Sequence, residues 1–161
     1  MATTIGAQTL TVTITEALTM THSASSNADD RTHSQTITKT FGSIDNLEKR
    51  LLNLPNTNQV EVITLGTTAA SAPGTFLRSA VKYIRFTNLD DTNGVAVILE
   101  DTGGDMASVL VVAGATLMLT DTQVEGGNTG AAWAAWANID QIFLKAASAN
   151  VQVEVVVATT A

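Results

Sequence analysis

The chain of 161 residues contains no cysteine, few aromatic residues and few charged ones. Without cysteine, neither a disulfide framework nor a thiolate metal site can form. Charged residues make up 14% of the chain, whereas typical soluble domains have about 25%. Two explanations remain open. Either part of the surface lies against other subunits, since interface cores are depleted in charge, or a threonine-rich sheet face is solvated through its hydroxyl groups.

Basic residues are also scarce and scattered, with 8 lysines and arginines against 15 acidic residues and a formal net charge of −7. Nucleic-acid-binding proteins usually carry a basic stripe, so we expect no nucleic acid partner. No segment approaches the roughly 20 apolar residues of a membrane helix. Residues 1–20 also lack the basic start and apolar run of a signal peptide. The sequence therefore predicts no membrane partner, and a chain kept in the cytosol until it assembles.

Motifs for catalysis are missing as well. The two histidines, His22 and His33, lie in a polar stretch without a nearby patterned carboxylate or serine, and neither H-E-x-x-H nor G-x-S-x-G occurs. The glycine-rich run GGNTGAAW (126–133) lacks the G-K-[ST] ending of a phosphate-binding loop, so we interpret it as a connection. We expect that the protein is not an enzyme and has no cofactor.

What the sequence does contain is alternation. In TLTVTITEALTMT (9–21), apolar side chains including Leu10, Val12 and Ile14 fall on one face and threonines on the other, which predicts a long strand. Glu16 interrupts the apolar face and predicts a bend. The run 150–158 is the clearest strand, with four valines on one face that we assign to the core: Val151, Val153, Val155 and Val157.

Many other short runs also have strand character and are separated by turn residues, which is typical of a β-sandwich or jelly roll. We therefore predict an all-β fold, a single β-sandwich or jelly-roll-like domain with an N-terminal extended arm. The arm comprises residues 1–35, a strand and the polar loop 22–34, and the sandwich comprises 36–161. The strand-like runs are 35–41, 59–65, 81–88, 94–100, 107–113, 115–120, 140–146 and 150–158.

The segment SIDNLEKRLLNLP (43–55) is ambiguous. Its isoleucine and leucines fit helical spacing, and Ser43 could cap the helix. An extended conformation would instead place Glu48 and Arg50 on the same side as two leucines. We predict a short helix over 43–54.

The stretch LDDTNGVAVILE (89–100) matches most of the calcium-loop template D-x-[DN]-x-[DN]-G-x5-E. Leu89 stands at the first ligand position, and the flanks have strand character instead of the helices that the motif needs. We therefore predict a turn between two strands. The alternative is a looser calcium site on Asp90, Asp91 and Asn93, with Asp105 as a further ligand.

Trp133 and Trp136 are spaced so that a short helix over 130–137 would place them on one side. Large aromatic side chains dominate core burial, so we expect this pair in the core or at a subunit interface. An aromatic platform for a ligand is the alternative.

The stretch VKYIRFTNLDDTN (81–93), followed by an apolar strand, resembles small virion structural proteins of tailed bacteriophages, particularly marine and cyanobacterial ones. The segments LEKRLLNLP and VVAGATLMLTDTQV and the valine-rich last strand fit the same resemblance, which covers roughly 36–161. The resemblance implies a non-enzymatic β-sandwich subunit that is present in many copies in the virion and assembles in the host cytoplasm.

From these observations we expect a capsid decoration or cement protein that binds the major capsid protein or other virion proteins. We expect a homo-oligomer, a trimer, whose contacts include Leu10, Val12 and Ile14 on the arm together with Trp133 and Trp136. A structural or receptor-binding module of the tail or baseplate is the alternative, although the 4% of aromatic residues disfavours a receptor-binding tip.

Overall fold

The computed structural model describes residues 8–20, 31–68, 72–120, 136 and 138–161. Its contacts divide the chain into two compact units, Met1–Ile44 and Asp45–Ala161. The boundary therefore follows Ile44, whereas the sequence placed it after residue 35. We call the first unit the hairpin and the second the body.

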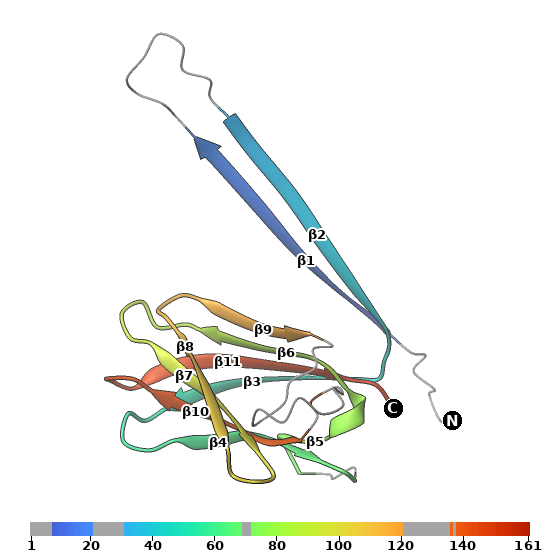
Figure 1. The fold of residues 1–161 in the computed structure, drawn as a ribbon, viewed down its shortest axis with the longest axis vertical. Coiled ribbons are helices and arrows are strands. Elements are labelled where there is room, and N and C mark those ends of the chain that lie inside the picture. Colours follow the sequence, from blue (N-terminus) through green and yellow to red (C-terminus); the bar gives the residue numbers. More distant parts are fainter. Residues whose placement is uncertain (1–7, 21–30, 69–71, 121–135, 137) are drawn as a thin grey trace. The chain divides into compact units, whose positions relative to one another are not determined.

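The hairpin consists of β1 (Gln8–Met20) and β2 (Arg31–Ile44), which pair in antiparallel orientation (Figure 1). The bend predicted at Glu16 is wrong, because Glu16 pairs with Gln35 in an uninterrupted ladder; the one irregularity lies between Gln8 and Leu10. β2 also begins inside the predicted loop 22–34. Pairing with β1 extends it there, and residues 21–30 lie outside the described part of the chain.

The body is all β apart from one short 3-10 helix in its described residues, and each strand-like run predicted between 59 and 158 is found as a strand. The short β5, just after the predicted turn at 72–74, was not expected. The elements are β3 (Asn46–Leu54), β4 (Val60–Gly66), β5 (Thr75–Leu77), η1 (Arg78–Ala80), β6 (Val81–Asn88), β7 (Val95–Asp101), β8 (Met106–Val111), β9 (Thr116–Thr120), β10 (Ile139–Ala146) and β11 (Val151–Thr159).

The strands of the body form two sheets, with the orders β5-β4-β10-β7-β8 and β3-β11-β6-β9 (Figure 1). The pairing is nested. β3 pairs with β11, β4 with β10, β6 with β9 and β7 with β8, all antiparallel. Nested antiparallel pairs distributed over two packed sheets form a jelly roll, so the predicted fold class is confirmed. β5 is an addition that pairs in parallel with β4.

The core cluster lies between the two sheets and consists of apolar side chains. It takes alternate residues from most strands of the body, with β8 contributing Val111 alone, because successive side chains of a strand point to opposite faces. Val155 and Val157 of β11 are each 1% exposed, as their assignment to the core predicted. Other side chains that are fully buried in this cluster include Ile63, Ile84, Phe86, Val95, Ile142, Leu144 and Val153.

The helix predicted over 43–54 is wrong, since residues 46–54 form β3 at the edge of the four-stranded sheet. Glu48 and Arg50 do lie on the inward side, where they form an ion pair of 2.6 Å from Arg50 Nε to Glu48 Oε1. Arg50 also donates a hydrogen bond of 2.6 Å to the carbonyl oxygen of Val62 in the opposite sheet. These contacts pair the two charges, whose inward placement seemed unfavourable for a strand.

Gly74 allows this arrangement. Its φ is +80°, and a Cβ atom there would approach both Arg50 Nη1 and the Val62 carbonyl oxygen to 2.9 Å. A side chain would therefore collide with the guanidinium that links the two sheets. Within the described ranges, no helix is long and apolar enough to cross a membrane.

Candidate functional site

The loop that resembles a calcium-binding motif is a hydrogen-bonded turn. Asp90 Oδ1 accepts hydrogen bonds from the backbone N–H of Thr92 at 2.9 Å and of Asn93 at 2.6 Å, and from the Asn93 side chain at 3.2 Å. These bonds, chiefly that from the Asn93 N–H, lower the pKa of Asp90. The predicted turn between β6 and β7 is confirmed, and one oxygen of the Asp90 carboxylate holds the turn together.

Asn88 joins this turn to the connection between β8 and β9. It is 1% exposed, and its amide donates to the carbonyl oxygens of Asn93, Val111 and Val112 at 2.8, 3.2 and 3.1 Å. Its side-chain oxygen accepts from the Asp90 N–H at 3.1 Å. The buried amide therefore has partners for both of its polar ends, which is what burial of a polar group requires.

Asp105 does not join the 90–93 loop, contrary to the suggested calcium set. It lies in the turn after β7, whereas the loop precedes that strand, so about 20 Å of strand separates them. Asp105 instead donates its N–H to Asp101 Oδ1 at 2.8 Å. In the part of the chain that the structure describes, no group of three or more histidine, cysteine, aspartate or glutamate residues could hold a metal ion.

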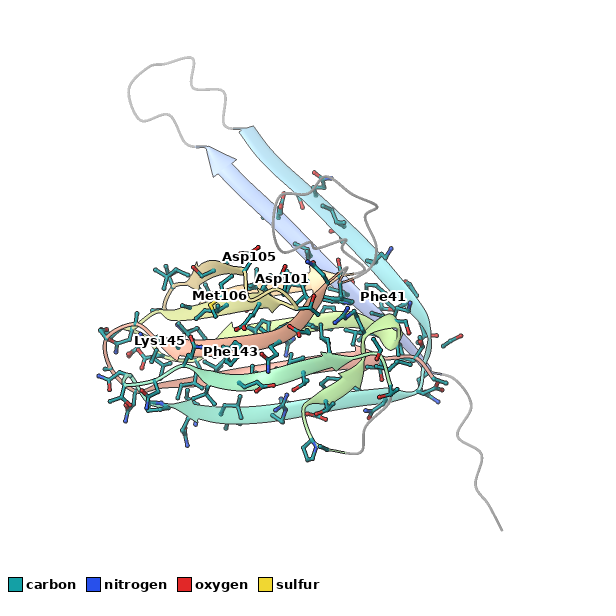
Figure 2. All side chains as sticks on the ribbon, turned by 60° about the horizontal axis from the view of Figure 1, so that its bottom comes forward. Phe41, Asp101, Asp105, Met106, Phe143 and Lys145 are labelled. Atoms are coloured by element: carbon teal, nitrogen blue, oxygen red, sulfur yellow. The ribbon has the colours of Figure 1, made fainter. Side chains whose placement is uncertain are left out.

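Asp101 organises the β7–β8 turn. It is 6% exposed; besides the Asp105 N–H, its carboxylate accepts the Gly103 N–H at 2.8 Å and the Asn138 amide at 2.7 Å. Three donors around a buried carboxylate make a structural anchor, and its position relative to Asp105 and Met106 is shown in Figure 2.

Trp136 belongs to the core. It is fully buried, and its indole N–H donates to the Val81 carbonyl oxygen at 3.1 Å. Core placement is thus confirmed for Trp136, and its contact with another subunit stays a prediction. Trp133, the run 126–133 and most of the predicted helix 130–137 lie outside the described residues, as does His22. His33 lies in β2 opposite Leu18.

The remaining predicted contact residues lie in β1. Leu10 and Val12 are partly exposed, and Ile14 is exposed, as is Ile37, its partner in β2. The hairpin thus has accessible apolar side chains.

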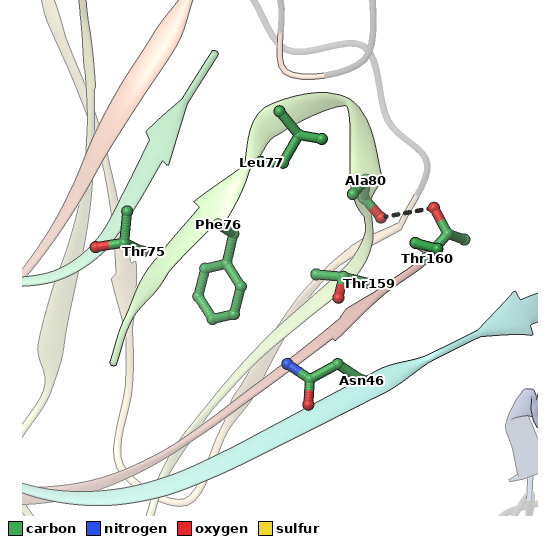
Figure 3. Close-up of a pocket in the computed structure, with 8 residues that line it drawn as sticks. Asn46, Thr75, Phe76, Leu77, Ala80, Thr159 and Thr160 are labelled. Atoms are coloured by element: carbon green, nitrogen blue, oxygen red, sulfur yellow. Dashed lines mark hydrogen bonds between the residues drawn. The ribbon is translucent and has the colours of Figure 1, made fainter. Parts of the chain in front are cut away.

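A pocket of about 240 Å³ opens between η1 and the ends of β3, β5 and β11 (Figure 3). The Thr160 N–H and hydroxyl donate to the carbonyl oxygen of Ala80 at its margin, at 2.9 and 3.4 Å. None of the described residues that line it has an acidic, basic or histidine side chain. The lining residues are Asn46, Thr75, Phe76, Leu77, Ala80, Thr159, Thr160 and Ala161.

The outer face of the four-stranded sheet carries an ionic group. Glu154 of β11 pairs with Lys49 of β3 at 2.5 Å and with Arg85 of β6. The hydrogen bond from Lys49 is the main cause of a lowered pKa for Glu154, partial desolvation opposes it, and the two positive charges lower the pKa further. This face therefore includes charged groups beside its exposed leucines, Leu47 and Leu51.

The outer face of the five-stranded sheet differs. Strand register places Phe143, Ile98 and Ser108 in one row across β10, β7 and β8. The neighbouring rows contain Ala96 with Leu110, and Glu100 with Met106. Leu110 is 58% exposed and Met106 56%. We call this surface the outer apolar patch. Figure 2 shows two of its members, Met106 and Phe143, together with Lys145 beside it. Its members are Ala96, Ile98, Met106, Leu110 and Phe143.

Sequence reasoning missed the outer apolar patch, although a signal was present. In VAVIL (95–99), both alternating sets of side chains are apolar, while an antiparallel strand with one solvated face shows polar residues at every second position. Uninterrupted apolar sequence in an antiparallel strand indicates that both faces are suited to burial.

Comparison of the chain with protein-family models, curated proteins and solved structures found no match.

Proposed function

We propose that the protein is a structural subunit of a tailed-phage virion that decorates the head and stabilises it through contacts with the major capsid protein. The jelly roll supports this proposal, because viral capsid domains commonly use this fold. The sequence resemblance over 36–161 points the same way. A fold alone does not define a function, so the proposal depends on what the surface offers to partners.

The hairpin is the observation that carries the proposal. β1 and β2 form a unit of their own, and in the described ranges each pairs with the other and with no further strand. An isolated two-stranded hairpin is at best marginally stable in water. Its free edges expose backbone groups that can add to a neighbouring sheet. We therefore assign the hairpin to attachment, as the arm through which the subunit binds the particle.

The composition suits the same role. A subunit whose surface is partly covered by neighbours needs less charge than a free monomer, and interface cores are poor in charged residues. The acidic character also fits a position outside a DNA-filled shell better than contact with the genome. Many copies, each making several weak contacts, can hold firmly through avidity. In this role the protein works by binding, without a catalytic reaction.

A module of the tail or baseplate is the second candidate. The jelly roll favours it too, because lectin domains share this architecture. In this role the protein would bind a receptor or support the tail tip, and it would be present in few copies.

The location and copy number of the protein in purified virions distinguish the two roles. Heads and tails are separated, and each fraction is analysed on a stained gel against the major capsid protein. We expect hundreds of copies in the head fraction. Retention in tails with absence from heads would contradict the decoration role and favour the tail module.

Removing the hairpin tests its assignment. A variant lacking residues 1–44 should keep the β-rich circular dichroism of the body and should no longer bind particles that lack the protein. A matched control keeps the hairpin and carries a substitution on the body, Leu51→Ser, and it should still bind. Full binding by the truncated variant would refute the hairpin as the arm.

A further inference from the structure

The outer apolar patch is exposed on a well-packed sheet whose other face forms the core. Leu110 and Met106 are more than half exposed, while Phe143, Ile98 and Ala96 beside them are partly exposed. Contiguous apolar surface of this kind marks an interaction site on a soluble protein. Among the described residues of the body, no strand covers this face.

Charges at the ends of the patch indicate which partner fits. Lys145 lies at one end, opposite Ala96, and Glu100 lies at the other end, opposite Gln141. Four positions along β10 separate the two ends (Gln141 to Lys145), which corresponds to about 13 Å of strand. Lys145 and Glu100 of one subunit are therefore too far apart to pair, and the patch is positive at one end and negative at the other.

We propose that the outer apolar patch binds the same patch of a second copy, related by a two-fold axis that crosses the strands near Phe143 and Ile98. In a two-fold contact each residue meets a partner twice, in reciprocal pairs. Reversal of strand direction brings Lys145 of each copy to the end where its partner has Glu100. Glu61 lies on β4 in the same row, opposite Phe143, and accepts a hydrogen bond of 2.5 Å from the Thr64 hydroxyl. The axis therefore also brings the Glu61 side chains of the two copies toward each other, and the Lys145–Glu100 pairs at both ends offset their repulsion.

The size of the face sets the strength of this contact. With a strand spacing of about 4.8 Å and a rise of about 3.3 Å per residue, four strands of about seven residues cover roughly 19 by 23 Å. For the four strands β4, β10, β7 and β8, two copies thus contribute roughly 900 Å² of projected area, slightly below the ~1,000 Å² that stable specific interfaces exceed. An area of this size suits a weak, reversible dimer, whereas the sequence analysis expected a trimer.

The contact is independent of the virion role, since dimerisation in solution needs neither head nor tail. Sedimentation equilibrium of the full chain, over micromolar to hundred-micromolar concentrations, should give a reversible monomer–dimer equilibrium. Leu110→Glu should raise the dissociation constant at least about tenfold, because it places a charge on the most exposed apolar side chain of the contact. Leu51→Glu is the matched control on the other outer face, where the leucine is also 58% exposed, and it should leave the equilibrium unchanged.

A charge exchange tests the orientation. Lys145→Glu and Glu100→Lys should each weaken the dimer, and the double variant should restore it, since the exchanged pair forms between copies. Circular dichroism and thermal unfolding of each variant confirm that the fold is retained. A monomeric or trimeric wild-type protein, or a Leu110→Glu variant that dimerises normally, would overturn the proposal. Failure of the double variant to restore dimerisation would overturn the two-fold orientation.

Discussion

The two outer faces of the jelly roll differ in the side chains that they expose. The four-stranded sheet presents Glu154 between Lys49 and Arg85, so charged groups satisfy one another in contact with water. The five-stranded sheet presents Phe143 and Ile98 at its centre, with Glu61 beside Phe143 on β4, and Lys145 and Glu100 lie at the two ends of the patch. Both sheets bury an apolar inner face in the same core. Folding alone requires only the inner faces to be apolar. The need for a core therefore does not explain the apolar side chains on the outer face of the five-stranded sheet, and we relate them to the proposed association.

The most severe way to disturb this arrangement is to place a charge on an inner face. Val155→Asp inserts a carboxylate at a position that is 1% exposed between the sheets. We expect a loss of at least about 4 kcal/mol of unfolding free energy, because an unpaired buried charge has no compensating partner. Urea denaturation followed by circular dichroism measures the loss. Gln152→Asp, at an exposed position of the same strand, should cost far less; equal losses would show that the inner and outer faces of β11 are wrongly assigned.

A smaller effect is expected at the turn between β7 and β8. Asp101→Ala removes the acceptor for three hydrogen bonds and should lower the unfolding free energy by about 1–3 kcal/mol, since the donors lose their partner. Asp105→Ala is the control in the same turn, because Asp105 is exposed and bonds to Asp101 through its backbone. Thermal unfolding that changes equally in both variants would contradict the anchoring role of the Asp101 carboxylate.

The charged face should contribute little to stability, and its contribution should depend on pH. Glu154→Gln should cost less than about 1 kcal/mol at neutral pH, as is usual for ion pairs near the surface. Because folding lowers the pKa of Glu154, its contribution is present above the pKa of the unfolded chain. The contribution is lost as the pH falls through the folded pKa. The difference between wild type and variant, measured by denaturation from pH 7 to pH 3, should therefore shrink toward acid; a difference that grows would refute this.

The smallest effect is expected from divalent metal. Asp90 already accepts three hydrogen bonds from its own turn, so EDTA should leave the melting temperature unchanged. Calcium should not alter it after dialysis. A drop of several degrees with EDTA that calcium reverses would show that residues 89–100 bind the ion.

Alternation in the sequence was sufficient to predict the fold class and the positions of most strands. It failed over residues 46–54, where leucines at helical spacing suggested a helix. The inward Glu48 and Arg50 of β3 form an ion pair, and Arg50 donates to the Val62 carbonyl oxygen on a different strand. Contacts of that kind depend on which strands become neighbours, and local periodicity carries no information about the order of strands in a sheet.

For the same reason, the sequence predicted the turn at Asp90 but neither the role of Asp101 nor the outer apolar patch. The turn at Asp90 follows from local chemistry, because Asp and Asn bond to their own backbone a few residues further on. The role of Asp101 depends partly on Asn138, which is distant in the sequence. The outer apolar patch requires three strands to be placed side by side. Its sequence signal, the continuous apolar run of β7, indicated burial on both faces without revealing the neighbouring strands.

The nested pairing of the strands also affects how quickly the protein can fold. β3 is the first strand of the body along the chain, yet its partner is β11, with Asn46 opposite Thr159. Folding rates fall as the sequence separation of contacting residues increases, and all-β domains rich in distant contacts fold in milliseconds to seconds. During synthesis, at about 5–20 residues per second, β3 remains without its partner for several seconds. Its inward leucines, Leu52 and Leu54, which pack in the core of the folded body, are then accessible to chaperones and to other nascent chains.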